Sequence, residues 1–267
     1  MDPGTPRGGR LAPGDELLTP WPTYPLYPLL ARRCGAQAVP ARGARLEALV
    51  GAVTPRTRLV MLCSPNDPTG EVMSTEILRA LLEELPERVV VVLDEALVDF
   101  TTSHPRDAAL ALLEDHPRFV VVRTFSKAWG LAGLRCGYAL GGPGAEPLLE
   151  RLAPPLGVGE LAQAGALEAL RSTADLVARR ARTVAVERDV LTRRLRSLGT
   201  RYRATGAGRL SSAPQSAADW RSSTPVVCSR MRRQARVGSG SCAAACSTIL
   251  RTRLPEISSP WRSQIAR

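Results

Sequence analysis

The sequence predicts an α/β fold, a mostly parallel sheet with helices on both faces, and two observations support this prediction. The first is a set of unbroken apolar runs at 59–62, 89–93 and 119–122. Strands buried on both faces of a parallel sheet show such continuous runs rather than an alternation of apolar and polar residues. The second is a helical pattern at 74–85, between the first two runs. Strands that alternate with helices indicate an α/β domain.

The first part of the chain is expected to hold two strands and two short helices. Residues 1–14 are rich in Pro and Gly and show no periodicity, which indicates a loop or a disordered start. Residues 13–27 indicate a short strand that runs into a proline-rich turn. A helix at about 27–34 and a strand at 35–40 follow. A short helix is then predicted at 46–53, where a Thr-Pro pair ends it.

The central part is expected to alternate buried strands with a helix. A strand is predicted at 58–64, and another at 88–94. The helix at 74–85 between them has one apolar face, with Ser74 in the N-cap position. Pro86 follows its last turn and ends it.

The net charge of +11 is concentrated at the end of the chain. Residues 211–267 hold nine Arg against Asp219 and Glu256, which accounts for +7 and leaves +4 for the rest. This segment also holds twelve Ser and has no strand or helix periodicity. It is either a disordered basic tail or, in the interpretation we prefer, out-of-frame translation of a GC-rich gene. A nucleic-acid-binding protein is a further alternative on charge alone, and it predicts binding that weakens steeply with salt.

Other site classes find little support in the sequence. The six cysteines form no CxxC pair and no zinc spacing, and neither histidine has partners at metal spacing, so no metal site is expected. No signal peptide is apparent, and no apolar run is long enough to span a membrane. We therefore expect a cytoplasmic protein that binds neither membranes nor nucleic acid.

The only lysine of the chain is Lys127, since every other cationic side chain apart from histidine is an arginine. An arginine cannot form a Schiff base, whereas a partly desolvated lysine amine can attack a carbonyl carbon. Thr124 and Ser126 place hydroxyl groups after the strand at 119–122, at the end where ligands bind in open α/β sheets. Arg135 could form a bidentate pair with a phosphate. A stray surface lysine is the alternative interpretation.

Asp94 is a second candidate, because it lies at the carboxyl end of the buried strand at 88–94. A carboxylate there can bind a positively charged group of a ligand. The alternative is an Asp that only caps the turn that follows. The position of Lys127 after the next buried strand favours the first interpretation.

The string Ser-Lys-Ala-Trp-Gly-Leu-Ala-Gly-Leu-Arg-Cys-Gly-Tyr at 126–138 resembles the lysine region of the class I/II aminotransferases. These are fold-type-I enzymes that use pyridoxal 5'-phosphate (PLP), and the histidinol-phosphate aminotransferase branch is the most similar. The resemblance implies a PLP-dependent transferase-like large domain and a partial small domain. It also implies amino transfer between an amino acid or amino alcohol phosphate and a 2-oxo acid, in a homodimer. Two alternatives stay open: a catalytically impaired remnant and a PLP-dependent amino acid phosphate decarboxylase.

The resemblance also implies roles for individual residues. Lys127 would form the Schiff base with PLP and act as the catalytic residue. The residues implied to contact the cofactor are Tyr24, Asp67, Asp94, Thr124, Ser126, Lys127 and Arg135. Tyr24 would stack on the pyridine ring, although it could equally be a core aromatic residue in a turn.

Two positions depart from the family pattern. Asp67 stands where the family has an Asn that donates to the phenolic oxygen of the cofactor, and Leu97 stands where the family has a Tyr that does the same. Loss of two donors and gain of a carboxylate disfavour the phenolate, so we predict a raised pKa for the Schiff base.

The domain limits follow from the extent of the resemblance, which covers about 11–205. Residues 158–198 contain no Pro and predict one long or kinked helix, which in the family links the large domain to the small one. We therefore predict a partial PLP-binding large domain at 1–155 and a linker helix with the start of a small domain at 156–210. A basic tail of low order is predicted at 211–267. The family's N-terminal phosphate-binding turn and its small-domain arginine have no recognisable counterpart, which implies a truncated chain.

Overall fold

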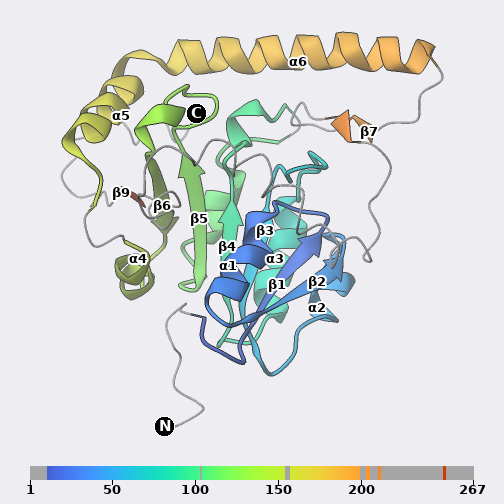
Figure 1. Cartoon of the computed structure of the whole chain (residues 1–267), viewed down its shortest axis with the longest axis vertical. Coiled ribbons are helices and arrows are strands. Elements are labelled where there is room, and N and C mark those ends of the chain that lie inside the picture. The colour runs from blue at the N-terminus through green and yellow to red at the C-terminus, as the bar shows by residue number, and fades with distance from the viewer. Residues whose placement is uncertain are drawn as a thin grey trace, which may run out of the picture.

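The structure of the protein is a computed structural model that describes residues 11–102, 104–153 and 157–198, together with the backbone of three two-residue strands beyond them (Figure 1). The strands are β1 (Glu16–Trp21), β2 (Gln37–Arg42), β3 (Thr57–Cys63), β4 (Val90–Asp94), β5 (Phe119–Thr124), β6 (Gly137–Gly141), β7 (Arg203–Ala204), β8 (Leu210–Ser211) and β9 (Ile249–Leu250). The helices are α1 (Leu26–Arg33), α2 (Leu46–Val50), α3 (Thr75–Glu84), α4 (Glu146–Leu152), α5 (Glu160–Ser172) and α6 (Ala174–Ser197), with 3-10 turns η1 (Val98–Phe100), η2 (Ala108–Leu112) and η3 (Ala132–Leu134).

The main sheet has the strand order β2-β1-β3-β4-β5-β6-β9. Neighbouring strands from β2 to β5 are parallel, and β6 pairs with β5 in the antiparallel direction. The mostly parallel sheet is therefore confirmed. The sequence analysis did not predict β6, which begins and ends with glycine, a residue type that is depleted in strands. Gly137 begins β6 close to β5, where a Cβ atom would lie 2.7 Å from the carbonyl oxygen of Arg123.

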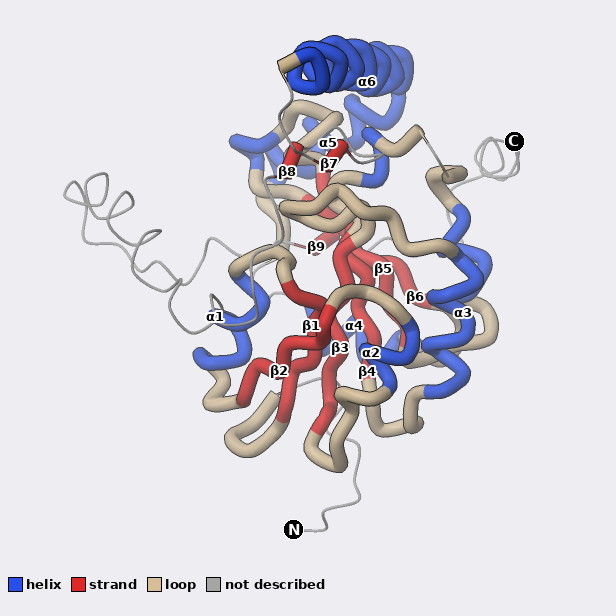
Figure 2. Tube along the Cα trace, turned by 90° about the vertical axis from the view of Figure 1, so that its right-hand side faces the viewer, coloured by secondary structure: helices blue, strands red, loops and turns tan. Residues whose placement is uncertain are grey.

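Helices cover both faces of the sheet, as predicted, and Figure 2 shows α1 and α3 on opposite sides of the strands. On one face the buried side chains of β3, β4 and β5 pack with those of α2, α3 and η2. On the other face, Val90, Val92 and Val120 pack on Leu148 of α4. Next to them, Leu17 of β1 packs with Tyr27 and other residues of α1. Burial of both faces explains the continuous apolar runs of β4 and β5.

The helix predicted at 74–85 is α3, and its N-terminus has the expected cap. The Ser74 hydroxyl oxygen accepts a hydrogen bond from the Ile77 backbone N–H at 3.3 Å. Leu78 and Leu81 are buried on the inner side of the helix. The helix predicted at 46–53 is shorter than expected, since α2 ends at Val50.

Replacing Ser74 with Ala should lower the free energy of unfolding by about 1 kcal/mol, because one N–H group of the first turn loses its partner. Ser172→Ala is the matched control: the Ser172 hydroxyl donates to the Glu168 carbonyl oxygen inside α5, and its loss should change stability by less than about 0.5 kcal/mol. Urea unfolding of both variants measures the difference. Equal midpoints for the two variants would contradict the capping role.

The segment predicted as one long or kinked helix forms two helices, α5 and α6, which separate at Thr173. The Thr173 backbone leaves the helical region at φ −117° and ψ 12°, while its hydroxyl donates to the Ala169 carbonyl oxygen at 2.7 Å. Figure 1 shows α6 running across the end of the molecule, and most of its residues are exposed. Among the described residues, no helix has both the length and the apolar character needed to cross a bilayer.

The predicted domain limits at 155 and 210 stay predictions. Of the loop or disordered start predicted at 1–14, residues 1–10 lie outside the described residues, and residues 11–14 are in neither helix nor strand. The basic tail also lies outside the described residues, apart from the backbone of Ser211 and β9.

Candidate functional site

Most candidate residues lie at or shortly after the carboxyl ends of the adjacent strands β3, β4 and β5, whereas Tyr24 follows β1 and Arg135 precedes β6. Cys63 at the end of β3 is paired with Asp94 at the end of β4, and Asp94 is paired with Val122 of β5. Because side chains alternate along a strand, Cys63, Asp94, Val122 and Thr124 face the same side of the sheet. This is the side covered by α1 and α4. Lys127 follows three residues after the end of β5.

Asp94 is partly buried and holds two hydrogen bonds. Its Oδ2 atom accepts from the Tyr27 hydroxyl at 2.7 Å, and its Oδ1 atom accepts from the Ala96 backbone N–H at 2.9 Å. Burial raises the pKa of the carboxyl, while these hydrogen bonds and the positive charge of Lys127 act against that rise. The contact with Ala96 is the turn cap considered above, and it occupies only one of the two oxygens.

Lys127 is exposed, whereas the sequence argument had required a partly desolvated amine. The turn that carries it is well anchored. The Gly130 N–H donates to the Lys127 carbonyl oxygen at 3.0 Å, and Nη1 of Arg180, on α6, donates to the Ala128 carbonyl oxygen at 2.8 Å. Gly130 has φ +78°, a backbone conformation that favours glycine, and a Cβ atom there would lie 2.7 Å from Arg180 Nη1. The backbone of Lys127 is thus held in place although its side chain reaches solvent.

Thr124, Ser126 and Arg135 form one cluster beside the lysine turn. The Thr124 hydroxyl oxygen accepts from the Ser126 N–H at 3.0 Å, and Arg135 Nη1 donates to the Ser126 hydroxyl oxygen at 3.4 Å. Arg135 is exposed and lies in the left-handed region at φ 53°. For a non-glycine residue that conformation costs roughly 1–2 kcal/mol. Arg135 Nη1 also donates to the Ala132 carbonyl oxygen at 2.8 Å. A guanidinium beside two hydroxyl groups has donors that an anion could accept from.

Tyr24 and Asp67 lie in two loops that a buried asparagine joins. Asn66 Oδ1 accepts from the Thr23 hydroxyl at 2.8 Å, and Asn66 Nδ2 donates to the Pro22 carbonyl oxygen at 2.9 Å. Asn66 therefore fixes the loop that carries Tyr24. The adjacent Asp67 is partly buried, and its negative charge raises the pKa of Asp94. Tyr24 is partly buried as well, with its ring in an edge contact with the Tyr27 ring at 5.6 Å between centroids.

The sequence analysis did not single out Tyr27 or Asn66. Tyr27 was assigned to the start of a helix, and nothing in its local sequence indicates a partner 67 residues away. The Pro-Thr-Tyr and Pro-Asn-Asp-Pro turns at the ends of two strands were the only available signal.

The opposite face of the sheet holds a separate buried charge cluster. Arg123 Nε donates to Glu95 Oε2 at 2.8 Å, and its Nη1 donates to Asp107 Oδ1 at 2.7 Å. The side chains of Arg123 and Glu95 are 5% and 6% exposed. Because Glu95 and Arg123 follow Asp94 and precede Thr124, strand alternation points them away from the candidate site.

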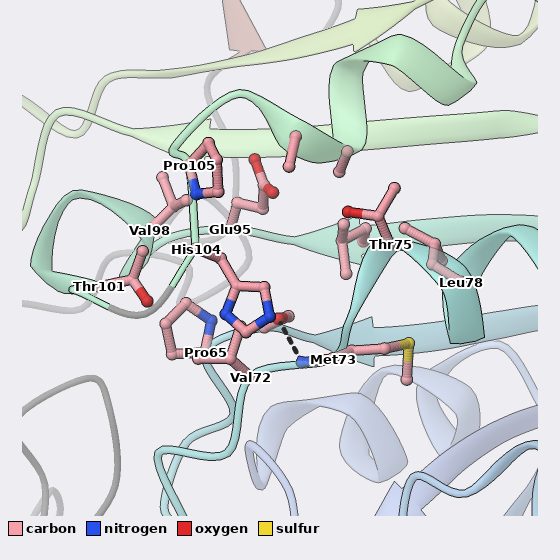
Figure 3. Close-up of a pocket in the computed structure, with 14 residues that line it drawn as sticks. Pro65, Val72, Met73, Thr75, Leu78, Glu95, Val98, Thr101, His104 and Pro105 are labelled. Carbon is pink, nitrogen blue, oxygen red and sulfur yellow. Dashed lines mark hydrogen bonds between the residues drawn. The ribbon is translucent and has the colours of Figure 1, made fainter.

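Glu95 also lines a small cavity, with Thr101, His104 and the residues around Met73 (Figure 3). The cavity holds about 30 Å³, which is room for one or two water molecules and far too little for a cofactor. His104 is half-buried there. Groups of three or more metal-ligating side chains are absent from the described part of the chain.

Comparison with known proteins links the chain to one family. The model of the family "Aminotransferase class I and II" matches residues 5–211. The aromatic amino acid aminotransferase of Cutibacterium acnes is 44% identical over 177 residues, which are 64% of this chain and 50% of the relative. That of Corynebacterium efficiens is 40% identical over 67% of this chain and 54% of the relative. The chain spans about half the length of the curated relatives it matches.

Solved structures share the fold. The histidinol-phosphate aminotransferase of Sinorhizobium meliloti, in complex with pyridoxal-5'-phosphate, has a TM-score of 0.65 at 30% identity. The match covers 75% of this chain and 57% of that one. The aspartate aminotransferase of Thermus thermophilus with maleate has a TM-score of 0.64 at 25% identity, over 75% of this chain and 56% of that one.

Proposed function

Because the chain belongs to the aminotransferase class I and II family, we propose that it catalyses PLP-dependent amino transfer between an amino acid and a 2-oxo acid. One observation carries the proposal: the only lysine of the chain follows the strand next to β4, and its charge acts on the carboxylate that ends β4. An amine and a carboxylate at adjacent strand ends suit PLP, since the amine can bind its aldehyde and the carboxylate can bind its pyridine nitrogen.

The residues present fit PLP in three respects. Its aldehyde needs a primary amine, which Lys127 supplies from an anchored turn. Its phosphate needs hydroxyl and guanidinium donors, which Ser126 and the strained Arg135 supply side by side. Its pyridine nitrogen needs a carboxylate, and Asp94 presents one that is already hydrogen-bonded through both oxygens. PLP, when bound, supplies an electron-accepting ring that makes the substrate Cα acidic.

In this proposal each side chain has a defined task. Lys127 holds the cofactor and, once the substrate amine has replaced it, moves the proton at the substrate Cα. Asp94 stays ionised against the pyridine nitrogen. Thr124, Ser126 and Arg135 bind the phosphate, with Thr124 orienting the Ser126 backbone. Tyr24 covers the ring, in the loop that Asn66 fixes.

For the substrate, we propose an aromatic amino acid, with an amino alcohol phosphate such as histidinol phosphate as the second candidate. The curated relatives named above are aromatic amino acid aminotransferases. Histidinol phosphate is supported by a solved histidinol-phosphate aminotransferase, whose sequence identity to this chain is lower. We also propose a homodimer in the cytoplasm, with 2-oxoglutarate-like 2-oxo acids as acceptors. An exposed Lys127 agrees with a site that a second subunit completes.

The test is a half-reaction followed by absorbance. The full chain is loaded with PLP, and its visible band is recorded after addition of phenylalanine, tyrosine or histidinol phosphate without a 2-oxo acid. Loss of the band with release of the matching oxo product supports transfer, and the most efficient donor identifies the substrate. That product is a 2-oxo acid from phenylalanine or tyrosine and a ketone phosphate from histidinol phosphate. Release of CO₂ would favour the decarboxylase alternative. A stable band that no amine alters would indicate a catalytically impaired remnant.

Asp67→Asn should lower the pKa of the Schiff base in the PLP-loaded chain, because it removes a negative charge that favours the protonated Schiff base. The expected shift is roughly 1 unit, the usual effect of one nearby charge. A pH titration of the absorbance measures it, with Glu71→Gln as a control that removes a carboxylate from the same loop. An unchanged or higher pKa in Asp67→Asn would contradict the predicted influence of Asp67.

A further inference from the structure

We propose that Tyr27 is a positioning residue for Asp94, one that orients the carboxylate and keeps it ionised for the cofactor. The proposal rests on the proposed function, since it assigns Asp94 to the pyridine nitrogen. It starts from a contact between two elements far apart in the sequence. Tyr27 lies in the first turn of α1, and its hydroxyl donates to Asp94 Oδ2 at 2.7 Å.

The two hydrogen bonds of Asp94 fix the plane of its carboxylate. One comes from the Tyr27 side chain and the other from the Ala96 backbone, and each uses a different oxygen. Rotation about the Cβ–Cγ bond would break both. Each carboxylate oxygen has about two acceptor positions, so one position remains on each oxygen for a pyridine N–H. The carboxylate is therefore oriented before any cofactor binds.

Tyr27 is itself held rigidly. It is 3% exposed and packs with Leu17 of β1, with Ala31 of α1 and with Ala36, three residues after the end of α1. Its ring also meets the Tyr24 ring edge to face. The Tyr27 hydroxyl is thus aimed by the same packing that joins α1 to the sheet, and it connects the loop of the proposed stacking residue with the end of β4.

The charges around Asp94 explain why it needs this donor. Burial raises the pKa of Asp94, and the nearby negative charge of Asp67 raises it further. The Tyr27 hydroxyl, the Ala96 N–H and Lys127 oppose the rise. Cys63, opposite on β3, is no competing anion, because burial raises the pKa of its thiol to about 12. Burial also raises the pKa of Tyr27 itself, so its hydroxyl stays a donor over the working pH range.

Tyr27→Phe keeps the ring and removes only the hydroxyl. We expect the dissociation constant of PLP to rise about 10- to 100-fold, the effect of losing one hydrogen bond to a charged group. The loss should be largest in acid. Without the hydroxyl the pKa of Asp94 rises, so the pH below which PLP is released moves upward. Absorbance titration of the full chain with PLP at several pH values measures both changes.

The control is Tyr138→Phe, which removes a hydroxyl from a tyrosine of β6 whose ring packs on Phe125. It should leave PLP affinity and its pH profile unchanged. A double-mutant cycle with Asp94→Asn separates positioning from a general loss of structure. If Tyr27 acts through Asp94, then Tyr27→Phe causes no further loss of affinity in the Asp94→Asn background.

The outcomes are distinguishable. If the unmodified chain binds no PLP at Lys127, the proposed function itself fails. If the unmodified chain binds PLP and Tyr27→Phe binds it equally at every pH, the role of Tyr27 is wrong. Additive losses in the cycle would overturn the role as well, because they would mean that Tyr27 acts independently of Asp94.

Discussion

Replacing Lys127 with Ala should abolish covalent attachment of PLP to the chain and reduce amino transfer by a factor on the order of 10⁴ or more, as for loss of a catalytic nucleophile. The chain has no other lysine, so no second ε-amine can take over. Borohydride reduction of the PLP-loaded chain, followed by peptide mapping, should label the peptide with Lys127 in the unmodified chain and no side chain in the variant. The fold should be unaffected, because the Lys127 side chain is exposed.

The matched control for this prediction adds a lysine elsewhere. Arg79 is exposed on α3, and Arg79→Lys in the Lys127→Ala background restores a primary amine to the chain without restoring it to the site. This double variant should show neither the visible band nor the activity. Labelling of the N-terminal amine alone in the unmodified chain, or activity that survives Lys127→Ala, would contradict the assignment of Lys127.

Replacing Arg123 with Met should lower the free energy of unfolding by about 3–5 kcal/mol, because it leaves the buried carboxylate of Glu95 without its partner. Arg123 binds Glu95 through Nε and Nη2, and it also binds Asp107 and the Arg106 carbonyl oxygen. A loss of this size is a large part of the roughly 5–15 kcal/mol that stabilises an ordinary domain. Denaturant unfolding measures it.

An ion pair with an exposed carboxylate provides the comparison. Arg188 Nε donates to Asp189 Oδ1 at 3.0 Å, and the Asp189 side chain is 55% exposed. Asp189→Asn should therefore cost less than about 1 kcal/mol. Adding Glu95→Met to Arg123→Met should recover much of the loss, since no uncompensated buried charge then remains. Equal costs for Arg123→Met and Asp189→Asn would show that burial of the cluster does not determine its importance.

The pH dependence of Arg123→Met follows from the direction of the Glu95 shift. Burial raises the pKa of Glu95, and Arg123 opposes that rise. The variant lacks the positive charge of Arg123, so the pKa of Glu95 in the folded state rises further. The folded state then binds the Glu95 proton more tightly than the unfolded state, in which the pKa of a glutamate is about 4.3. Stability then falls as the pH rises above that value, so the deficit should be smaller in acid than at neutral pH.

Much of the fold could be predicted from local sequence. The apolar runs of β3, β4 and β5 identified the buried strands, because burial on both faces leaves no polar positions. Ser74 and Pro86 marked the ends of α3 through backbone chemistry that acts within a few residues. The single lysine and the hydroxyl residues beside it marked the candidate site for the same reason: their chemistry and spacing are local. β6 was missed, because the glycine that begins it, Gly137, lies against the backbone of Arg123 in β5 rather than in a turn.

Only the tertiary structure decided how these residues meet. The Tyr27–Asp94 hydrogen bond joins residues 67 positions apart, and the Arg123–Glu95 pair joins residues 28 positions apart. Neither contact has a local signature, because each depends on which strand lies beside which and on the face where a side chain falls. The exposure of Lys127 was also beyond sequence reasoning, since solvent access depends on what packs over a turn. The sequence by itself thus determined the buried strands and the chemistry available at their ends, and the packing of α1 on the sheet decided how that chemistry is oriented.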